Sequence, residues 1–508
     1  MSKRVLDEYE PLLVEEVKAR ARTKVSNTNL LIATFAVCIG GTFQYGFNIS
    51  VVNGATMHVQ SFINQTFVDR YQTDISEFLL TLLWSIIVTS LTIGGFIGSM
   101  ISGTLAMKLG RKGALLVNNI FALMAALMMG LSSPSGLYEL LIFGRLLSGI
   151  NAGIGLCVQT LYLSEIPPTP LRGALGIGTS VSITFGILIG QLAGLKELLG
   201  REELWPVLLS TTCIPAFLQL LILPFSPESP RYLLIDKGNL EGCKKALKQL
   251  HGANYKKELD DIELERKSLG SVKTRTTWDV IRDGSIRWQL ITIMLLHAAQ
   301  QLNGINAIYF YANYLFKQAG IPVDKIPYVT LGCGACECIT ALTCGFLIDN
   351  VGRKVLILGG YGLMSICCVL FTIMLSFQTA SPVMPYLSVV CVFIFILSFG
   401  LGPGGVTNIL SIELFTQTTR PAAYVIAGSV NWFSFFFIGL VFPFIVIGLQ
   451  QYCFLVFLAI CFFMALYIFL FIPETKNKTF TEIQNKLNSS NNEIHTDRAG
   501  SISFSTYF

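Results

Sequence analysis

The chain has 508 residues, of which 52% are hydrophobic and only 13% are charged. Soluble globular proteins carry roughly 25% charged residues, so this composition excludes an ordinary soluble protein and indicates an integral membrane protein. The net charge of +5 gives no sign of a nucleic-acid partner. Lysine and arginine are instead concentrated in a few short connections, which is the pattern that orients membrane proteins.

The amino-terminal segment, residues 1–28, is charged and lacks a small-residue cleavage site before the first apolar run. We therefore expect no cleaved signal peptide and a cytoplasmic amino terminus. Residues 29–225 contain apolar runs of about 20 residues, long enough to cross a bilayer core of about 30 Å. They predict six membrane spans, at roughly 29–52, 77–102, 113–132, 137–164, 173–197 and 204–225. The sequon at Asn64 falls between the first two, so we expect an extracellular glycan there.

The middle of the chain, residues 226–286, is polar with apolar residues at helical spacing. It predicts short amphipathic helices on the cytoplasmic side rather than a catalytic domain. Residues 287–472 predict six more spans, at roughly 288–316, 327–348, 354–377, 383–412, 421–446 and 450–472. Residues 473–508 become polar and predict a disordered tail, which an even number of spans places in the cytoplasm.

Three pairs of motifs recur in the two halves in the same order and at nearly the same separation. GTLAMKLGRKG at 103–113 resembles GFLIDNVGRKV at 345–355, at an offset of 242 residues. SEIPPTPLRG and IELFTQTTRP each place a glutamate seven residues before an arginine, and PESPR at 227–231 matches PETKN at 473–477. The predicted fold is therefore an all-α membrane protein of twelve transmembrane helices in two six-helix pseudo-repeats.

The repeated motifs gather acidic and basic residues at the cytoplasmic ends of spans. We expect a charge network that locks one face of the bundle while the other is open, formed by Arg111, Glu165, Arg172, Glu228, Arg231, Arg353, Glu413, Arg420 and Glu474. The alternative is that the basic residues only orient the chain. Acidic loop residues contribute little to topology, so this alternative does not explain the four glutamates.

Two six-span repeats around one central site are the architecture of alternating access in secondary transporters. The segments GRLLSGINAG, LYLSEIPPTPLRG, PESPRYLL, QQLNGINAIYFY, DNVGRK, NWFSFFFIG and PETKNKTF resemble the GLUT-type facilitative hexose transporters of the major facilitator superfamily. The resemblance covers about residues 28–485, and GGTFQYGFNIS looks most like the fructose and glucose branch that includes member eleven. It implies a major facilitator fold and a hexose substrate. We expect a plasma-membrane protein that functions as a monomer, without a cofactor.

The segment QQLNGINAIYFY, residues 300–311, is the richest polar stretch inside an apolar span. Its amides, Gln300, Gln301 and Asn306, both donate and accept hydrogen bonds, as sugar hydroxyls do. The alternative is hydrogen bonding between helices. The resemblance favours substrate contact, and it also implies that the site is completed by Tyr45, Ile308, Tyr309, Asn431 and Trp432.

Three positions depart from the pattern of the glucose-selective members. Asn408 stands where those members keep a tryptophan, Ser180 where many use a glutamine, and Glu337 where they use an asparagine. A glutamate inside a membrane is costly, so we expect Glu337 to be functional; the alternative is a protonated or hydrogen-bonded glutamate between helices. These changes imply a wider pocket in which fructose is at least as well suited as glucose.

The energy source follows from what the first span lacks. Related proton-coupled carriers place an aspartate where this chain has Asn48, and an amide does not take up a proton near neutral pH. We therefore expect uniport of hexose, with a proton-coupled symporter or a urate uniporter as alternatives. Against urate, no lysine or arginine is expected to lie clearly within a central span, where it could bind an anion. Scattered histidines and the absence of paired cysteine clusters argue against an enzyme or a metal site.

Overall fold

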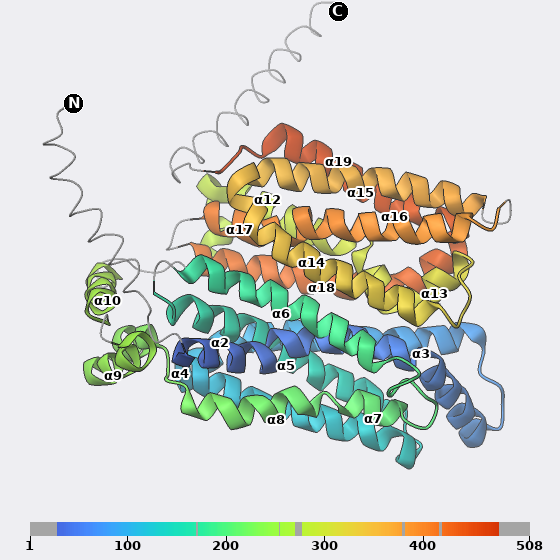
Figure 1. The fold of residues 1–508 in the computed structure, drawn as a ribbon, viewed down its shortest axis with the longest axis horizontal. Coiled ribbons are helices and arrows are strands. Elements are labelled where there is room, and N and C mark those ends of the chain that lie inside the picture. The colour runs from blue at the N-terminus through green and yellow to red at the C-terminus, as the bar shows by residue number, and fades with distance from the viewer. Residues whose placement is uncertain are drawn as a thin grey trace, which may run out of the picture.

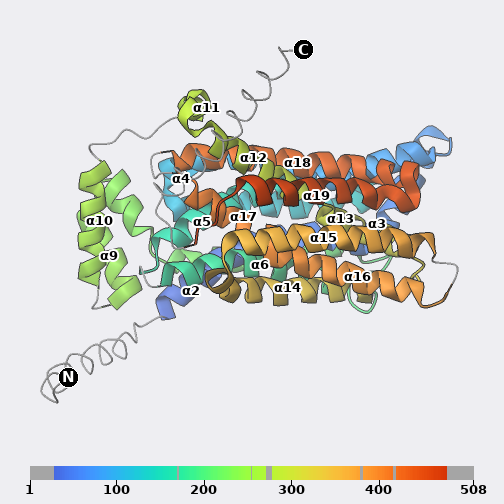
Figure 2. The ribbon, with the colours of Figure 1, turned by 90° about the horizontal axis from the view of Figure 1, so that it is seen from above.

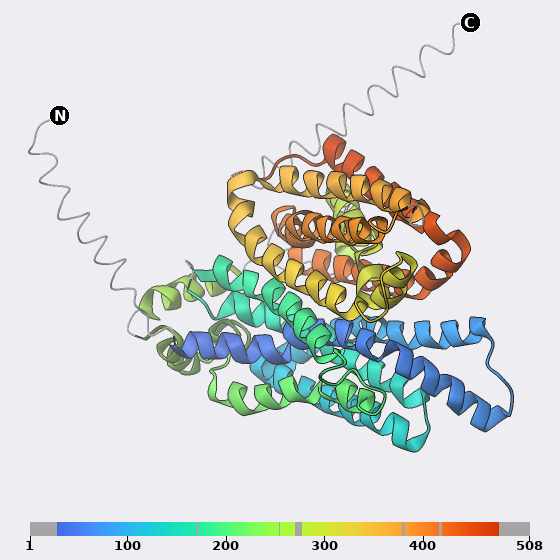
Figure 3. The ribbon, with the colours of Figure 1, turned by 45° about the vertical axis from the view of Figure 1, so that its right-hand side comes forward.

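The computed structural model describes residues 28–168, 171–252, 255–269, 277–377, 381–415 and 419–476. Within these ranges the chain is helical and has no strand. Two helical bundles lie side by side, one from the amino-terminal half and one from the carboxy-terminal half (Figures 1 and 3). This is the predicted arrangement of twelve membrane helices in two halves.

The first half contains α2 to α8, whose bounds are α2 (Thr28–Gly40), α3 (Thr42–Tyr71), α4 (Glu77–Ser135), α5 (Glu139–Glu165), α6 (Arg172–Ala193), α7 (Trp205–Ser210) and α8 (Cys213–Ile222). At 1.5 Å per residue, α4 would be about 90 Å long, three times the thickness of a bilayer core. It folds back at Gly110, where φ is 85°. The single helix α4 therefore supplies both the second and the third predicted spans.

The second half contains α12 to α19, whose bounds are α12 (Arg287–Leu302), α13 (Ile305–Gln318), α14 (Ile326–Val351), α15 (Arg353–Ser376), α16 (Met384–Phe399), the π-helix η6 (Gly400–Gly404), α17 (Gly405–Glu413), α18 (Arg420–Leu449) and α19 (Cys453–Phe471). The seventh span is broken at Gly304, where φ is 102°. The Asn303 side chain caps the second piece by accepting a hydrogen bond from the Ile305 N–H at 3.0 Å. The tenth span bends at Pro403 within η6.

Nine helices of the described residues are long and apolar enough to cross a membrane. One of them, Glu77–Leu131, is the pair of spans that turns at Gly110. The two remaining predicted spans are the shorter apolar helix Gly178–Ala193 and the broken pair α12 and α13. Together these helices account for the twelve predicted spans.

The polar middle segment forms α9 (Leu240–His251), α10 (Tyr255–Leu269) and α11 (Thr277–Arg282). Figures 1 and 2 show α9 and α10 beyond one end of the bundles. Their apolar faces enclose a small core of their own, formed by Leu234, Cys243, Leu247, Leu259 and Ile262. Most of the predicted tail, residues 473–508, lies outside the described residues.

The sequon at Asn64 lies within a helix rather than in a loop, because α3 continues to Tyr71. Asn64 itself is exposed, but Thr66 is buried. The expected loop between the first two spans is therefore short, and the glycan at Asn64 stays a prediction.

Candidate functional site

A charge network in the first half is centred on Arg111, at the turn inside α4. Its guanidinium bonds Glu165 at the end of α5 at 2.8 Å and Asp236 at 2.7 Å. The Glu228 carboxylate accepts hydrogen bonds from the backbone N–H groups of Arg111 and Lys112 at 3.0 and 3.1 Å. Because Gly110 has a positive φ, these two N–H groups open a helix and lack helical partners, so the carboxylate caps them.

The second half repeats this network at its own turn. Arg353 bonds Glu413 at 3.1 Å, and Glu474 accepts from the backbone N–H groups of Arg353 and Lys354, both at 3.0 Å. Gly352, with φ of 106°, takes the place of Gly110. The hydroxyls that follow the capping glutamates also correspond, since Ser229 donates to Glu165 and Thr475 donates to Glu413. The sequence repeat is thus matched by the same hydrogen bonds.

The described bonds of each network stay within one half of the molecule, and the expected locking of one face of the bundle stays a prediction. Arg231 pairs with Glu265 of α10 at 3.1 Å, again on the amino-terminal side. The side chains of Arg172 and Arg420 lie outside the described side chains, so their predicted part in the network stays a prediction.

An amide cluster joins three of the predicted substrate residues. Gln301 donates to the side-chain oxygen of Asn431 at 2.6 Å, and Asn306 donates to the side-chain oxygen of Gln301 at 2.7 Å. Gln300 lies nearby and donates to the Pro403 carbonyl at 3.3 Å. These bonds connect α12, α13, α18 and η6, so the amides also hold the helices together.

Trp432, one residue after Asn431, contacts the first half of the molecule. Its ring is 2% exposed and meets the Tyr45 ring edge-on, with centroids 5.7 Å apart. Gly95 of α4 lies against the same ring, so closely that an added Cβ would come within 2.6 Å of three ring atoms. The predicted aromatic residues therefore meet where α3, α4 and α18 come together, beside the amide cluster.

Glu337 lies in α14 and is 7% exposed. Its carboxyl lies beside the buried Tyr309 hydroxyl, with which it interacts. Asn53 of α3 donates to the Tyr309 carbonyl, which links this cluster to the first half. A buried carboxyl beside a tyrosine hydroxyl fits both a functional glutamate and a hydrogen-bonded glutamate between helices, so the role of Glu337 stays a prediction.

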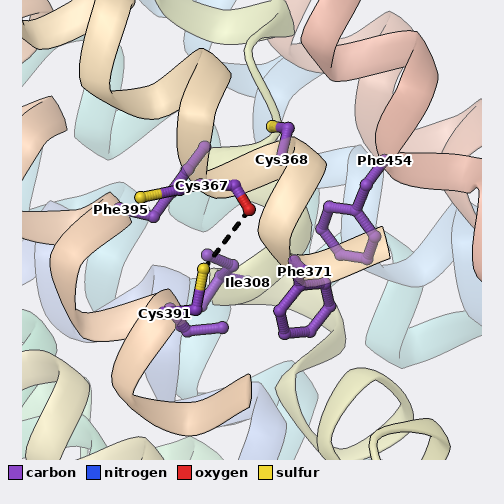
Figure 4. Close-up of a pocket in the computed structure, with 8 residues that line it drawn as sticks. Ile308, Cys367, Cys368, Phe371, Cys391, Phe395 and Phe454 are labelled. Atoms are coloured by element: carbon purple, nitrogen blue, oxygen red, sulfur yellow. Dashed lines mark hydrogen bonds between the residues drawn. The ribbon is translucent and has the colours of Figure 1, made fainter. Parts of the chain in front are cut away.

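Three predicted site residues do not join these clusters. Ile308 faces the interior of the second half, where it lines a small apolar cavity with Cys367, Phe371, Phe395 and others (Figure 4). This placement differs from the expectation that it lines the space between the halves, so we leave it out of the proposed site. Ser180 is half-buried in α6, and Asn408 is exposed, with its backbone carbonyl accepting from the Tyr424 hydroxyl at 3.4 Å.

Two buried residues of the spans were missed by the sequence analysis. Arg145 in α5 is 1% exposed and donates to the Asn48 carbonyl at 2.5 Å, which corrects the view that no basic residue lies within a central span. A lone arginine in a predicted span was the signal for it. His297 in α12 is 5% exposed, lies one turn before Gln301 and contacts Ser411 at 3.1 Å.

Comparison with known proteins gives the family. The family described as "Sugar (and other) transporter" matches residues 33–487. Human solute carrier family 2, facilitated glucose transporter member 11, is 43% identical over 471 residues, covering 92% of this chain and 95% of that protein. Mouse member 5 is 44% identical over 480 residues, covering 94% of this chain and 96% of that protein. Human member 9 is 44% identical over 471 residues, covering 92% and 87%.

Solved structures agree with the fold. The xylose transporter XylE from E. coli, in a partially occluded inward open conformation, has a TM-score of 0.73 at 22% identity, covering 89% of this chain and all of that chain. XylE bound to 6-bromo-6-deoxy-D-glucose has a TM-score of 0.71, covering 91% and 99%. With the family match over most of its length, this chain belongs to the sugar transporter family and has the major facilitator fold.

Proposed function

We propose that this protein is a facilitative carrier of hexoses, fructose, glucose or both, that works by alternating access. The observation that carries the proposal is the amide cluster of Gln301, Asn306 and Asn431, beside the Tyr45–Trp432 contact between the two halves. The similarity to proteins named facilitated glucose transporters supports it. Amides match sugar hydroxyls because both donate and accept.

The proposed binding site consists of Gln300, Gln301, Asn306, Asn431 and Trp432, with Tyr45, Tyr309 and Glu337 beside it. Ser180 and Asn408 do not join these clusters, and their part in substrate binding stays a prediction. Each hydrogen bond to a sugar contributes about 0.5–1.5 kcal/mol net. Three or four of them give an affinity in the millimolar range, near −4 kcal/mol. Weak binding suits a carrier, since it must release what it has captured.

Transport down the gradient is the proposed energy source. Asn48 is buried beside Arg145, and its amide does not titrate as the aspartate of a proton-coupled carrier would. The buried carboxyl of Glu337 in α14 is the observation that favours the second candidate, a proton-coupled symporter. Arg145 is also a buried cation, which could attract an anion. The uptake experiment below therefore includes urate.

The twin networks around Arg111 and Arg353 are proposed to stiffen the cytoplasmic ends of the two halves. The paired side chains of Arg111 and Glu165 are 13% and 10% exposed, and those of Arg353 and Glu413 are 15% and 24% exposed. Breaking such partly buried pairs costs more than breaking an exposed pair, which suits ends that move as rigid units. We propose that these ends face the cytoplasm, together with both termini, and that the membrane is the plasma membrane.

The test is uptake of labelled fructose, glucose and urate into proteoliposomes, with and without a proton gradient. We expect saturable hexose uptake with counterflow and no acceleration by inward protons. Faster hexose uptake under an inward proton gradient would show that the protein is a symporter and not a uniporter. Uptake of urate without uptake of hexose would show that the substrate is urate. A rate proportional to concentration without counterflow would indicate a channel.

Two variants test the site itself. Gln301→Ala and Asn306→Ala should each raise the KM for the hexose several-fold or abolish uptake. Gln219→Ala is the matched control, because Gln219 is a fully buried amide that bonds Asn119 and the Ala36 carbonyl within the first half. It should lower stability without changing KM. Normal kinetics in both site variants would remove the proposed site.

A further inference from the structure

His297 adds a further group to the amide cluster, and the proposed function so far makes no use of it. The ring is 5% exposed in α12, and its Nε2 lies 3.1 Å from the Ser411 hydroxyl oxygen of α17. Its Nδ1 has no hydrogen-bond partner among the described residues. The Asn431 amide lies beside the ring. The histidine therefore stands between α17 and α18 at the edge of the proposed site.

The direction of these hydrogen bonds is fixed by the chain's own acceptors. The Ser411 hydroxyl lies 2.9 Å from the Thr407 carbonyl oxygen, which can only accept. The Ser411 proton is therefore used there, and the hydroxyl oxygen accepts from Nε2–H of His297. A neutral imidazole that carries its proton on Nε2 has a lone pair on Nδ1. The ring thus offers an acceptor toward Asn431.

The neighbouring amides form a chain of hydrogen bonds that ends at Asn431, beside this acceptor. Asn431 accepts from Gln301 through its oxygen at 2.6 Å, so its NH₂ group is the end that suits the lone pair of His297. Gln301 in turn accepts from Asn306 through its own oxygen at 2.7 Å. Each side-chain NH₂ has two hydrogens. Gln301 uses one of them toward Asn431, and an Asn431 amide that donates to Nδ1 would use one there, so that each keeps a second N–H hydrogen for an oxygen of a bound molecule.

We propose that His297, supported by Ser411, is a positioning residue that holds the Asn431 amide so that the Gln301–Asn431 pair presents N–H donors to the sugar. This inference rests on the proposed function and specifies its chemistry. The substrate is a hexose whose contacted oxygen acts as a hydrogen-bond acceptor. An analogue with fluorine at that position, which can accept but not donate, should be bound much better than the deoxy analogue.

The test compares the KM values of the parent hexose, its deoxy analogues and its fluorodeoxy analogues, position by position. In the wild type we expect one position at which the deoxy analogue has a KM about tenfold above the parent, while the fluoro analogue stays within about twofold. His297→Gln keeps a donor toward Ser411 but removes the acceptor toward Asn431, so the difference between the two analogues should disappear. His297→Asn keeps an acceptor at the position of Nδ1, so the difference between the two analogues should persist in this variant.

Controls separate positioning from folding. His251 is a buried histidine at the cytoplasmic end, 2.8 Å from the Ile166 carbonyl, and His251→Gln should leave the difference between analogues unchanged. If the His297 variants do not fold, Ser411→Ala and Ser411→Thr replace them, because threonine keeps the hydroxyl that alanine removes. We expect Ser411→Ala alone to weaken the difference.

The possible results separate the positioning role of His297 from hexose transport itself. Equal behaviour of His297→Gln and His297→Asn, or a deoxy analogue bound as well as the fluoro analogue in the wild type, overturns the positioning role and leaves hexose transport standing. A wild type that transports no hexose overturns the proposed function and this inference with it.

Discussion

The contact between Gly95 and Trp432 gives a direct test of movement between the halves. A Cβ added to Gly95 would come within 2.6 Å of three ring atoms of Trp432, whereas carbon atoms in contact lie about 3.5–4.0 Å apart. The ring cannot easily turn aside, because it is 2% exposed and packs against Tyr45 and Phe435 at centroid distances of 5.7 and 6.2 Å. Gly95→Ala must therefore push α4 and α18 apart.

The size of the effect follows from where the strain falls. Overpacking by one methyl group costs about 1–3 kcal/mol. Because α4 and α18 belong to different halves, this cost applies only to the conformation in which the halves meet at Trp432. The equilibrium between the inward-facing and outward-facing carrier should then shift by about 5–150-fold.

The assay is the ratio of the KM values for zero-trans influx and efflux, which reports the direction that the empty carrier faces. Gly428→Ala is the matched control, since Gly428 lies one turn before Trp432 on α18 and an added Cβ there meets nothing within 4 Å. Gly95→Ala should change the ratio and Gly428→Ala should not. Identical ratios in the two variants would refute a contact that forms in one conformation only.

Three further predictions concern the turns and the first span. Gly352→Ala should destabilise the protein by about 1–3 kcal/mol in thermal unfolding, because φ is 106° and the new Cβ would lie 2.7 Å from Glu474, while Gly359→Ala, in open space, should be neutral. Burial raises the pKa of Glu474, but the backbone N–H donors outweigh it and hold that pKa below its usual value. Its stabilising effect is therefore present above the ordinary pKa of about 4.3 and lost as the pH falls through the lowered value, so the difference in melting temperature between wild type and Glu474→Gln should vanish in acid. Asn48→Asp places a titratable group beside Arg145, and uptake should become sensitive to a proton gradient; insensitivity would show that this position does not control coupling.

The spans and the twin turns could be predicted because their signals are local and periodic. A run of about 20 apolar residues specifies a membrane helix by length alone. The repeated Gly-Arg-Lys segments located Gly110 and Gly352, the positions at which the backbone takes a positive φ. The repeated motifs also placed Arg111, Glu165, Arg353 and Glu413 in one predicted network, but the pairing of Arg111 with Glu165 and of Arg353 with Glu413 comes from the structure.

Side-chain direction and partner choice were the parts that the sequence did not determine. Ile308 and Tyr309 are adjacent on α13, yet one lines the cavity inside the second half and the other lies beside Glu337, because successive side chains on a helix point about 100° apart. The contact of Arg145 could not be predicted because its partner is a backbone carbonyl, so no acidic residue in the sequence indicates it. The proposed role of His297 depends on its neighbours Ser411 and Asn431. Both are more than 100 residues away in the sequence, so the sequence did not indicate it.

The distribution of strong and weak contacts explains how such a molecule can rock as two bodies. The described ion pairs lie within one half, as Arg111–Glu165 and Arg353–Glu413 do, or involve α9 and α10. The described contacts between the halves are of another kind: the Phe78 and Phe444 rings at 5.5 Å, the Tyr45–Trp432 pair, and hydrogen bonds from Tyr328 to Glu197 and from Asn53 to the Tyr309 carbonyl. Breaking a few such contacts requires far less free energy than breaking a charge network. Charge networks inside each half, with ring contacts and isolated hydrogen bonds described between the halves, therefore allow rigid-body movement around the amide cluster.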